Sequence, residues 1–389
     1  MRNRIIIEIT SLVAVDFVSG IQRVVREIVT RMVRFRHQEN IEFVLVAYSE
    51  HRQCFYRIPE DKFLSCYCDR AIQSESLRKG DVYDLDELHQ GDLFFDIDSV
   101  WNNRIRRSFL LPILRSKGVR IAVMIYDIIP ILFPQYCDGQ TTVRFMDYIG
   151  AHLQYADLIL ANTESTLRDI EKLSLRIGSK PIPGLCAPLG ADFTKRQTTV
   201  NEVDPRAQVL SGKKYLLCVG TIEPRKNHAF LLDQYKQSLR TAGFSMVIAG
   251  RPGWNVEALM ADIRSIDAND EGFFYFSDAN DDTIDYLYQH AFFTVFPTQY
   301  EGYGLPLIES ILRGTPVLAS DISVLREVGG HYCDYFSLEN QAELHDILIK
   351  YMKDADAYQQ RKESLKQYVP LSWEMTENVV FQALEKIMN

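Results

Sequence analysis

Short apolar runs alternate along the chain with segments whose apolar residues recur at helical spacing. Residues 5–9 and 43–47 form two apolar runs that predict strands. Between them, apolar residues recur every three or four positions, which is typical of the buried face of a helix: Ile21, Val24, Val25, Ile28, Val29, Met32 and Val33. A strand, a helix and a strand in this order predict a parallel sheet. The turn at Ser19-Gly20 lies where ligands usually bind to such a sheet.

The same alternation continues to the end of the chain. Further strands are predicted at 91–101, 119–126, 155–161, 215–219, 244–249, 273–276, 291–296 and 316–319. Residues 48–90 show no readable order. Residues 193–212 are polar and predict a linker. A chain of 389 residues is too long for one ordinary core. We therefore expect an α/β protein with domains at 1–192 and 213–370 and a closing helical segment at 371–389.

Composition and charge limit the classes of function. The net charge of −9 argues against nucleic acid as a partner. The seven cysteines and eight histidines lack metal-site spacing, so we predict free thiols and no metal site. Glu8 interrupts the first apolar run, which argues for a strand rather than a signal peptide. No run reaches the ~18 apolar residues that a membrane span needs, and a cytoplasmic protein is expected.

Six basic residues occur between positions 104 and 120 with no acidic residue among them: Arg104, Arg106, Arg107, Arg115, Lys117 and Arg120. A solvated helix face is one explanation of such a run. The other is a patch for an anionic lipid surface or a lipid-diphosphate acceptor, with peripheral contact at the inner face of the plasma membrane.

A strand, a glycine-containing loop and a helix are predicted around residues 291–313. Gly302 and Gly304 let the backbone approach a ligand, and the helix, expected to start at Pro306, offers free N–H groups. Glu301 and Glu309 flank this anion site. Carboxylates accept hydrogen bonds from hydroxyls, so sugar or ribose is the natural partner.

A second ligand loop is predicted after the strand at 215–219. Arg225 and Lys226 immediately precede a helix expected from His228 to Leu239. Adjacent cations at a helix start oppose its dipole unless an anion is present, so the pair indicates a phosphate site. An exposed basic pair without a ligand is the alternative.

The segment from Glu301 to Glu309 resembles the signature of glycosyltransferase family 4, the retaining nucleotide-sugar transferases of GT-B fold. Its two glutamates are separated by seven residues that include Gly-Tyr-Gly-Leu-Pro. The resemblance is densest from Pro188 to Gly330, and Pro188–Asp192 is similar to the strand that ends the family's first domain. It implies two Rossmann-like parallel-sheet domains facing a cleft, with the donor mainly on the second and the last helix returning to the first. It implies no cofactor, because the nucleotide sugar is a co-substrate, and no metal.

The resemblance also implies roles for individual residues. Arg225 and Lys226 would bind the diphosphate, Glu301 the donor sugar and Glu309 the ribose. Thr221 occupies the place of a family arginine, for which Arg225 would substitute. The remaining donor residues are Gly20, Arg251, Gly302, Tyr303, Gly304 and Leu305.

On the acceptor side, the family carries a histidine and an acid at a strand end where this chain has Tyr126 and Asp127. Asp127 is therefore our candidate for contacting the acceptor hydroxyl, with a helix N-cap as the alternative. Asp98 and Trp101 could line an acceptor site, or they could simply form a strand end with a core tryptophan.

The predicted function is a retaining, metal-independent transfer of mannose from GDP-mannose onto a glycan acceptor, free or lipid-linked, in bacterial polysaccharide or O-antigen synthesis. A dTDP-rhamnose or UDP-sugar transferase is the alternative within this class. A GT-B epimerase, a phosphorylase and a non-catalytic nucleotide-sugar binding protein are alternatives outside it.

Overall fold

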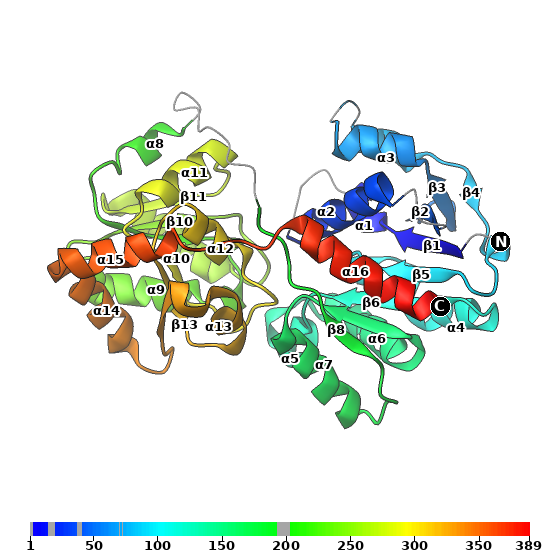
Figure 1. Ribbon diagram of the computed structural model, residues 1–389. Helices are drawn as coiled ribbons and strands as arrows, with labels where there is room; N and C mark the ends of the chain where they lie inside the picture. The colour runs from blue at the N-terminus through cyan, green and yellow to red at the C-terminus, as the bar shows by residue number, and fades with distance from the viewer. Residues whose placement is uncertain (1–2, 15–19, 37–40, 70, 72, 193–202) are drawn as a thin grey trace. The chain divides into compact units, whose positions relative to one another are not determined.

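A computed structural model describes residues 3–14, 20–36, 41–69, 71, 73–192 and 203–389 (Figure 1). The chain divides into two compact units. Unit 1 comprises Met1–Pro134, Gly139–Asp192 and Leu371–Asn389, and unit 2 comprises Gln135–Asp138 and Phe193–Pro370. Each unit is built on a mainly parallel sheet covered by helices, which confirms the predicted α/β class with two Rossmann-like domains.

The sheet of unit 1 has eight strands, and its two-strand edge is antiparallel. The strand order is β4 (Val82–Tyr83), β3 (Cys54–Ile58), β2 (Ile41–Ser49), β1 (Asn3–Glu8), β5 (Leu93–Asp96), β6 (Arg120–Ile125), β7 (Leu158–Ala161) and β8 (Gly184–Cys186). The antiparallel strands β3 and β4 come from the region that the sequence left unordered. The strand expected at Pro188–Asp192 is wrong: the edge strand ends at Cys186, and Pro188 has no N–H to continue the ladder.

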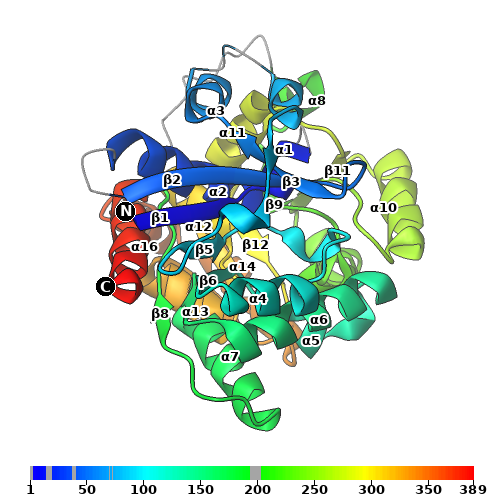
Figure 2. The same cartoon turned by 90° about the vertical axis from the view of Figure 1, so that its right-hand side faces the viewer.

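Helices cover both faces of this sheet (Figure 2). On one face, α16 (Trp373–Met388) packs against α2 (Gly20–Phe35), and the Phe381 ring lies 6.3 Å from that of Phe43 on β2. The other face carries the cores built with α4 (Arg107–Ser116), α6 (Gly139–Tyr155) and α7 (Glu164–Arg176). The short helices are α1 (Thr10–Ala14), α3 (Glu60–Tyr67) and α5 (Ile129–Leu132).

A fully buried arginine joins the ends of β1 and β5. The Arg107 guanidinium contacts Glu8 and lies 2.5 Å from Asp96, and the three side chains are at most 2% exposed. His152 Nε2 lies 3.1 Å from Asp96. Burial acts to raise the pKa of both carboxyls. For Asp96 the charges and hydrogen bonds of Arg107 and His152 together outweigh burial and lower the pKa, whereas for Glu8 burial prevails and raises the pKa.

The basic run from Arg104 to Arg120 is therefore not a free basic patch, because acids from elsewhere in the sequence neutralise most of it. Arg107 is buried in the cluster just described. Three more of these residues form ion pairs: Arg115 with Asp157, Lys117 with Asp86, and Arg104 with Glu50. Membrane contact through the run as a whole is therefore not supported.

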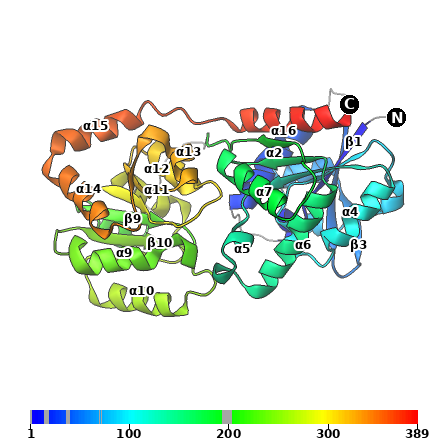
Figure 3. The ribbon, with the colours of Figure 1, turned by 90° about the horizontal axis from the view of Figure 1, so that it is seen from below.

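The sheet of unit 2 has six parallel strands. Their order is β11 (Phe273–Phe276), β10 (Ser245–Ala249), β9 (Tyr215–Val219), β12 (Phe293–Phe296), β13 (Val317–Ser320) and β14 (Cys333–Phe336). Figure 3 shows α9 (His228–Gln234) and α10 (Glu257–Asn269) on one side of it, and α11 (Asp281–His290) and α12 (Leu305–Leu312) on the other. The remaining helices are α8 (Pro205–Gln208), α13 (Ser323–Gly329), α14 (Gln341–Lys353) and α15 (Ala355–Leu365), and a π-helix at Tyr235–Leu239 continues α9.

The second half of the predicted linker belongs to the core of unit 2. Val203, Ala207 and Leu210, which lie in and beside α8, are buried in one core cluster with Tyr215 of β9 and Leu287 of α11. The first half, residues 193–202, lies outside the described residues.

We expect Arg107→Met to destabilise the chain by about 3–5 kcal/mol, because it leaves two buried carboxylates without their cation. Arg115→Met is the matched control on the same helix. The Arg115 side chain is 42% exposed, so its ion pair with Asp157 contributes at most about 1 kcal/mol to stability. Urea unfolding followed by circular dichroism measures both. Equal losses for the two variants would contradict the role assigned to the cluster.

Candidate active site

The candidate site lies where two loops leave the carboxyl ends of adjacent strands in unit 2. One loop follows β9 and the other follows β12, and these strands are neighbours at the centre of the sheet. From β9 the chain continues to β10 on one side, and β12 lies on the other. Ligands bind at such switch points of open parallel sheets.

Backbone hydrogen bonds fasten the two loops to each other. The Arg225 carbonyl accepts from Gln299 N at 2.8 Å and from Thr298 Oγ1 at 3.1 Å. The Arg225 guanidinium donates in return to the Tyr300 carbonyl at 3.1 Å. The position of Glu301 relative to the basic pair is therefore set by the backbone as well as by charge.

Glu301 lies between the two cations. Its Oε1 is 2.6 Å from Lys226 Nζ, and its Oε2 is 2.9 Å from Arg225 Nη1. Burial acts to raise the pKa of the Glu301 carboxyl, but the charges of Arg225 and Lys226 outweigh it and lower the pKa to about 2. The structure thus brings together three of the residues that the sequence assigned to donor binding, and Glu301 is ionised at neutral pH.

Glu223 also belongs to this cluster, although the sequence analysis gave it no role. Its Oε2 lies 2.9 Å from Arg225 Nε, and its side chain is 9% exposed. The four charges of Glu223, Arg225, Lys226 and Glu301 sum to zero. The sequence signal that could have identified it is its position in the same loop, two residues before the arginine.

The loop after β10 supports the loop after β9 from the other side. Ile222 N donates to the Arg251 carbonyl at 2.8 Å, and a Cβ on Gly250 would lie 1.9 Å from the Gly220 carbonyl oxygen. Only glycine at position 250 permits this approach. Arg251 and Thr221, both predicted donor residues, are exposed on these adjoining loops.

The loop after β12 leads into α12 through a left-handed residue. Gly304 precedes the helix with φ of 96°, a conformation that favours glycine. The helix starts at Leu305 rather than at Pro306, so Glu309 lies in the second turn rather than the first. Gly302 and Tyr303 are buried in the loop, and the first N–H groups of α12 have no acceptor within the helix.

His228, the first residue of α9, is an unexpected feature of the site. Its ring is 1% exposed, and neither ring nitrogen has a hydrogen-bond partner among the described residues. Burial, assisted by the charge of Lys226, lowers the pKa of His228 to about 3. The imidazole is therefore neutral next to the basic pair.

In unit 1, Gly20 is the first residue of α2, and a Cβ there would meet nothing within 4 Å. Packing thus does not require glycine at this position. Ser19, the other residue of the predicted turn, lies outside the described residues.

The residues at the end of β6 are held by local hydrogen bonds. The Tyr126 hydroxyl is buried and donates to the Ile97 carbonyl at 2.7 Å. Asp127 Oδ1 accepts from Ile129 N at 3.0 Å, at the start of α5. Asp127 lies one residue before the N-cap of α5, Ile128, so this is a local turn bond rather than the N-cap itself. An acceptor contact by Asp127 stays a prediction.

Asp98 and Trp101 also have structural explanations. The Asp98 carboxylate is fully buried and accepts from Leu12 N and Ser99 N, each at 2.7 Å. Burial raises its pKa to about 6 against the effect of these bonds. The carboxylate is thus committed to the backbone, and an acceptor role for Asp98 is not supported.

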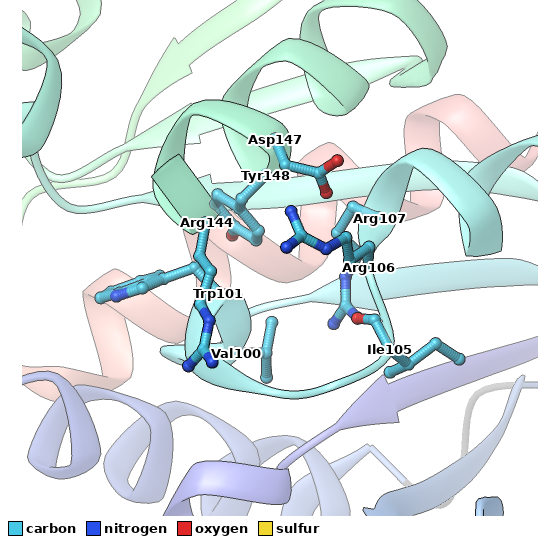
Figure 4. A pocket seen from close by; sticks show the side chains of 8 residues that line it. All are labelled: Val100, Trp101, Ile105, Arg106, Arg107, Arg144, Asp147 and Tyr148. Carbon is cyan, nitrogen blue, oxygen red and sulfur yellow. The ribbon is translucent and has the colours of Figure 1, made fainter. Parts of the chain in front are cut away.

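The Trp101 ring packs on α6, 5.1 Å from the ring of Phe145 and 5.7 Å from that of Tyr148. Figure 4 shows it at the edge of a cavity of about 10 Å³ that Arg107 and Tyr148 also line. This volume suits roughly one water molecule and no sugar. The tryptophan is therefore a packing residue of this region.

His228 makes a prediction about pH dependence. The pKa of His228 in the folded chain, about 3, lies below the ordinary histidine pKa of 6.5, so between these limits the unfolded chain binds the proton more readily. This contribution to stability is complete above pH 6.5 and is lost as the pH falls, by about 1.4 kcal/mol per unit. His228→Leu should therefore lose less stability than wild type between pH 7 and 5, in urea unfolding. The exposed His290→Leu should behave as wild type; identical pH slopes for all three would contradict the assignment.

Comparisons with known proteins show what each part of the chain resembles. Residues 201–368, within unit 2, match the family described as Glycosyl transferases group 1. The serotype-specific mannosyltransferase WbdA of Escherichia coli is 27% identical over 255 residues, which are 62% of this chain and 31% of WbdA. The O-antigen chain mannosyltransferase B of Escherichia coli is 28% identical over 215 residues, 54% of this chain and 55% of that protein. The chain thus spans about a third to a half of the length of these relatives.

Solved structures extend the likeness to both units. HepE of Anabaena, solved with UDP and glucose, superimposes with a TM-score of 0.64 at 13% identity, over 99% of this chain and 100% of HepE. Sucrose-phosphate synthase of Thermosynechococcus elongatus gives 0.62 at 15% identity, over 99% of each chain. At such identity the likeness concerns the fold alone. Residues 201–368 therefore form a glycosyl transferase group 1 domain, and the chain as a whole has the GT-B fold of glycosyltransferases.

Proposed function

We propose that the chain is a retaining glycosyltransferase that moves a sugar from a nucleotide donor onto a glycan acceptor. The observation that carries the proposal is the Glu301 carboxylate held between Arg225 and Lys226 at the switch point of unit 2. Two cations suit the diphosphate of a donor, and a carboxylate beside them suits the hydroxyls of its sugar.

Donor binding would exchange the partners of this cluster. The diphosphate would take Arg225 and Lys226 away from Glu301, and the donor's sugar hydroxyls would replace them as hydrogen-bond donors to the carboxylate. Backbone N–H groups of Gly302–Leu305 would add to the phosphate site, and Glu309 would hold the ribose.

In the transfer step, the acceptor hydroxyl oxygen bonds to the anomeric carbon while the bond from that carbon to the phosphate oxygen breaks. The electron pair leaves with the phosphate, which also takes the acceptor's proton, so the step needs neither a protein base nor a metal ion. Arg225 and Lys226 stabilise the charge that develops on the phosphate, the kind of preorganised electrostatic stabilisation that contributes most to many barriers.

GDP-mannose is the proposed donor, because WbdA is named as a serotype-specific mannosyltransferase and mannosyltransferase B as an O-antigen chain mannosyltransferase. By the same relatives, the proposed acceptor is a growing glycan, free or lipid-linked. UDP- and dTDP-sugars remain the alternative donors, and HepE was solved with UDP.

A thermal-shift panel of GDP, UDP, dTDP and ADP, followed by transfer assays with the matching sugar nucleotides, tests the proposal. A nucleotide at a hundredfold excess over its Kd should stabilise the protein by about 2.7 kcal/mol. Conversion of the nucleotide sugar without an acceptor would indicate an epimerase, and binding without turnover would indicate a non-catalytic protein. No shift with any nucleotide would refute the donor site.

The two charged partners should respond differently to substitution. Lys226→Ala and Glu301→Gln should each lower turnover at least about a hundredfold, as loss of a single charge-stabilising group does. Lys226→Ala should also weaken binding of the nucleoside diphosphate, measured by calorimetry. Glu301→Gln should bind it at least as tightly as wild type, because the competing carboxylate is gone. Lys236→Ala, at the exposed pair with Asp262, is the control; near-normal turnover in both site variants would contradict the mechanism.

No helix within the described ranges is long and apolar enough to cross a bilayer. An apolar surface on unit 1 nevertheless favours peripheral contact. Helices α4 and α6 run side by side (Figure 2). Ser108 near the start of α4 bonds to Asp147 in the middle of α6, and Arg115 near the end of α4 pairs with Asp157, just past the end of α6. Their outer faces form the α4–α6 surface: Phe109 (71% exposed), Ile113 (43%), Val143 (57%) and Met146 (48%).

The exposed Arg106 adjoins this surface, and apolar groups beside cations suit the interface of an anionic bilayer. Phe109→Ser with Met146→Ser should reduce co-sedimentation with phosphatidylglycerol vesicles at least about tenfold, since each apolar side chain withdrawn from water is worth ~1.5–3 kcal/mol. Leu175→Ser, equally exposed on α7, should leave binding unchanged. Failure of the wild-type chain to bind anionic vesicles would overturn the proposed contact, and self-association would identify a second copy as the partner.

A further inference from the structure

The carboxylate of Glu309 has a buried neighbour on another helix. The hydroxyl of Tyr288, on α11, lies 3.3 Å from Glu309 Oε2 and 3.3 Å from the Pro306 carbonyl, both on α12. The Tyr288 side chain is completely buried. A buried phenol keeps its hydrogen bond because leaving it unmade is costly, and an ionised carboxylate can only accept. The hydroxyl is therefore the donor in this contact.

Further contacts fix the Tyr288 ring. Thr315 Oγ1 donates to the Tyr288 carbonyl, and the Arg313 guanidinium lies 5.0 Å from the ring centroid. Arg313 in turn lies 2.6 Å from Asp285 on α11 and donates to the Glu309 carbonyl at 3.0 Å. The Arg313 contacts join α11 to the C-terminal end of α12, and the Thr315 bond holds the Tyr288 backbone, so the hydroxyl has little freedom to follow a moving carboxylate.

Burial, and after it the Glu309 charge, raise the pKa of Tyr288 well above its usual value. The phenol therefore stays protonated over the working range of any such enzyme and remains a donor. Glu309 is only partly buried, so its carboxylate is within reach of a ligand while Tyr288 is not.

We propose that Tyr288 is a positioning residue that orients the Glu309 carboxylate toward the two neighbouring hydroxyls of the donor ribose, and so makes the site selective for ribonucleotides. The inference rests on the proposed function, which gives Glu309 the ribose. A carboxylate with a fixed plane can accept from both hydroxyls at once, whereas a freely rotating one loses part of that geometry. Tyr288 contributes to nucleotide selectivity without touching the nucleotide.

The test compares the ribonucleoside diphosphate that the full-length chain prefers with its 2′,3′-dideoxy analogue. In Tyr288→Phe, the Kd of the ribonucleotide should rise about tenfold, the size of one modest hydrogen bond to a charged group. The Kd of the dideoxy analogue should not change, and kcat at saturating donor should stay within about twofold. A purely structural role would weaken both nucleotides equally and would overturn the inference.

Tyr235→Phe is the matched control, because Tyr235 is also buried in unit 2 and its hydroxyl donates to a carboxylate, Asp270, at 3.2 Å. It should leave the ratio of the two Kd values unchanged. Glu309→Gln separates the inference from the function on which it rests. If Glu309→Gln keeps the wild-type ratio, the ribose assignment of Glu309 fails and the inference fails with it.

If Glu309→Gln loses the preference and Tyr288→Phe retains it, the proposed function stands and the inference alone is overturned. The double variant supplies a further measurement. Its ratio should equal that of Glu309→Gln, because the hydroxyl acts only through the carboxylate. Additive losses would mean that Tyr288 affects ribose binding by another route.

Discussion

The site of unit 2 depends on one interaction, the double ion pair of Glu301 with Arg225 and Lys226. A carboxylate taken out of water without partners costs several kcal/mol, so the acid can be buried only where cations meet it. Its partners come from a loop about 75 positions earlier in the sequence, and only the adjacency of β9 and β12 places the two loops together. The hydrogen bonds at the Arg225 carbonyl and the close glycine at position 250 serve the same alignment.

Charge balance explains how the cluster can be both stable when empty and receptive to a ligand. The formal charges of Glu223 and Glu301 offset those of the two cations, so the cluster as a whole carries no net charge. On the proposed mechanism a diphosphate and a set of sugar hydroxyls arrive together. The phosphates then replace the carboxylate at the cations while the hydroxyls replace the cations at the carboxylate, so every charged group keeps a partner throughout.

Unit 1 has the same strand topology as unit 2 around its first strand, but its charged cluster is buried instead of accessible. In unit 1, β1 lies between β2 and β5, just as β9 lies between β10 and β12 in unit 2. In both sheets the strand order reverses at this point. Here too an arginine joins carboxylates at the strand ends, but Arg107 is 2% exposed, whereas Arg225 and Lys226 are 16% and 15% exposed. Arg107 is thus a structural element of the core, while the cations of unit 2 remain accessible to an anion.

The difference between Arg107 and Arg225 shows which features of the site could be predicted from the sequence. Arg225 and Lys226 follow a strand, as Glu301 does, and parallel strands place such loops at one sheet edge, so their meeting was predictable. Arg107 looked like part of a basic surface because its acids, Glu8 and Asp96, lie on other strands. The sequence marks His228 only as a helix start and gives Tyr288 no role, since nothing in the local pattern reveals which buried polar atoms face each other. The sequence did not predict the antiparallel strands β3 and β4 for a related reason. Their pairing is set by the edge of the sheet rather than by their own periodicity.

The end of β6 bears on the proposed chemistry. The resembling family has a histidine where this chain has Tyr126, and a histidine there could take up a proton. The Tyr126 hydroxyl is buried and donates to the Ile97 carbonyl, and burial together with Asp98 and Asp96 raises its pKa far above its usual value. A phenol held in this state cannot act as a base at neutral pH. The proton of the acceptor hydroxyl must then pass elsewhere, and the proposed leaving phosphate, held by Arg225 and Lys226, is the group whose basicity grows as its bond to the sugar breaks.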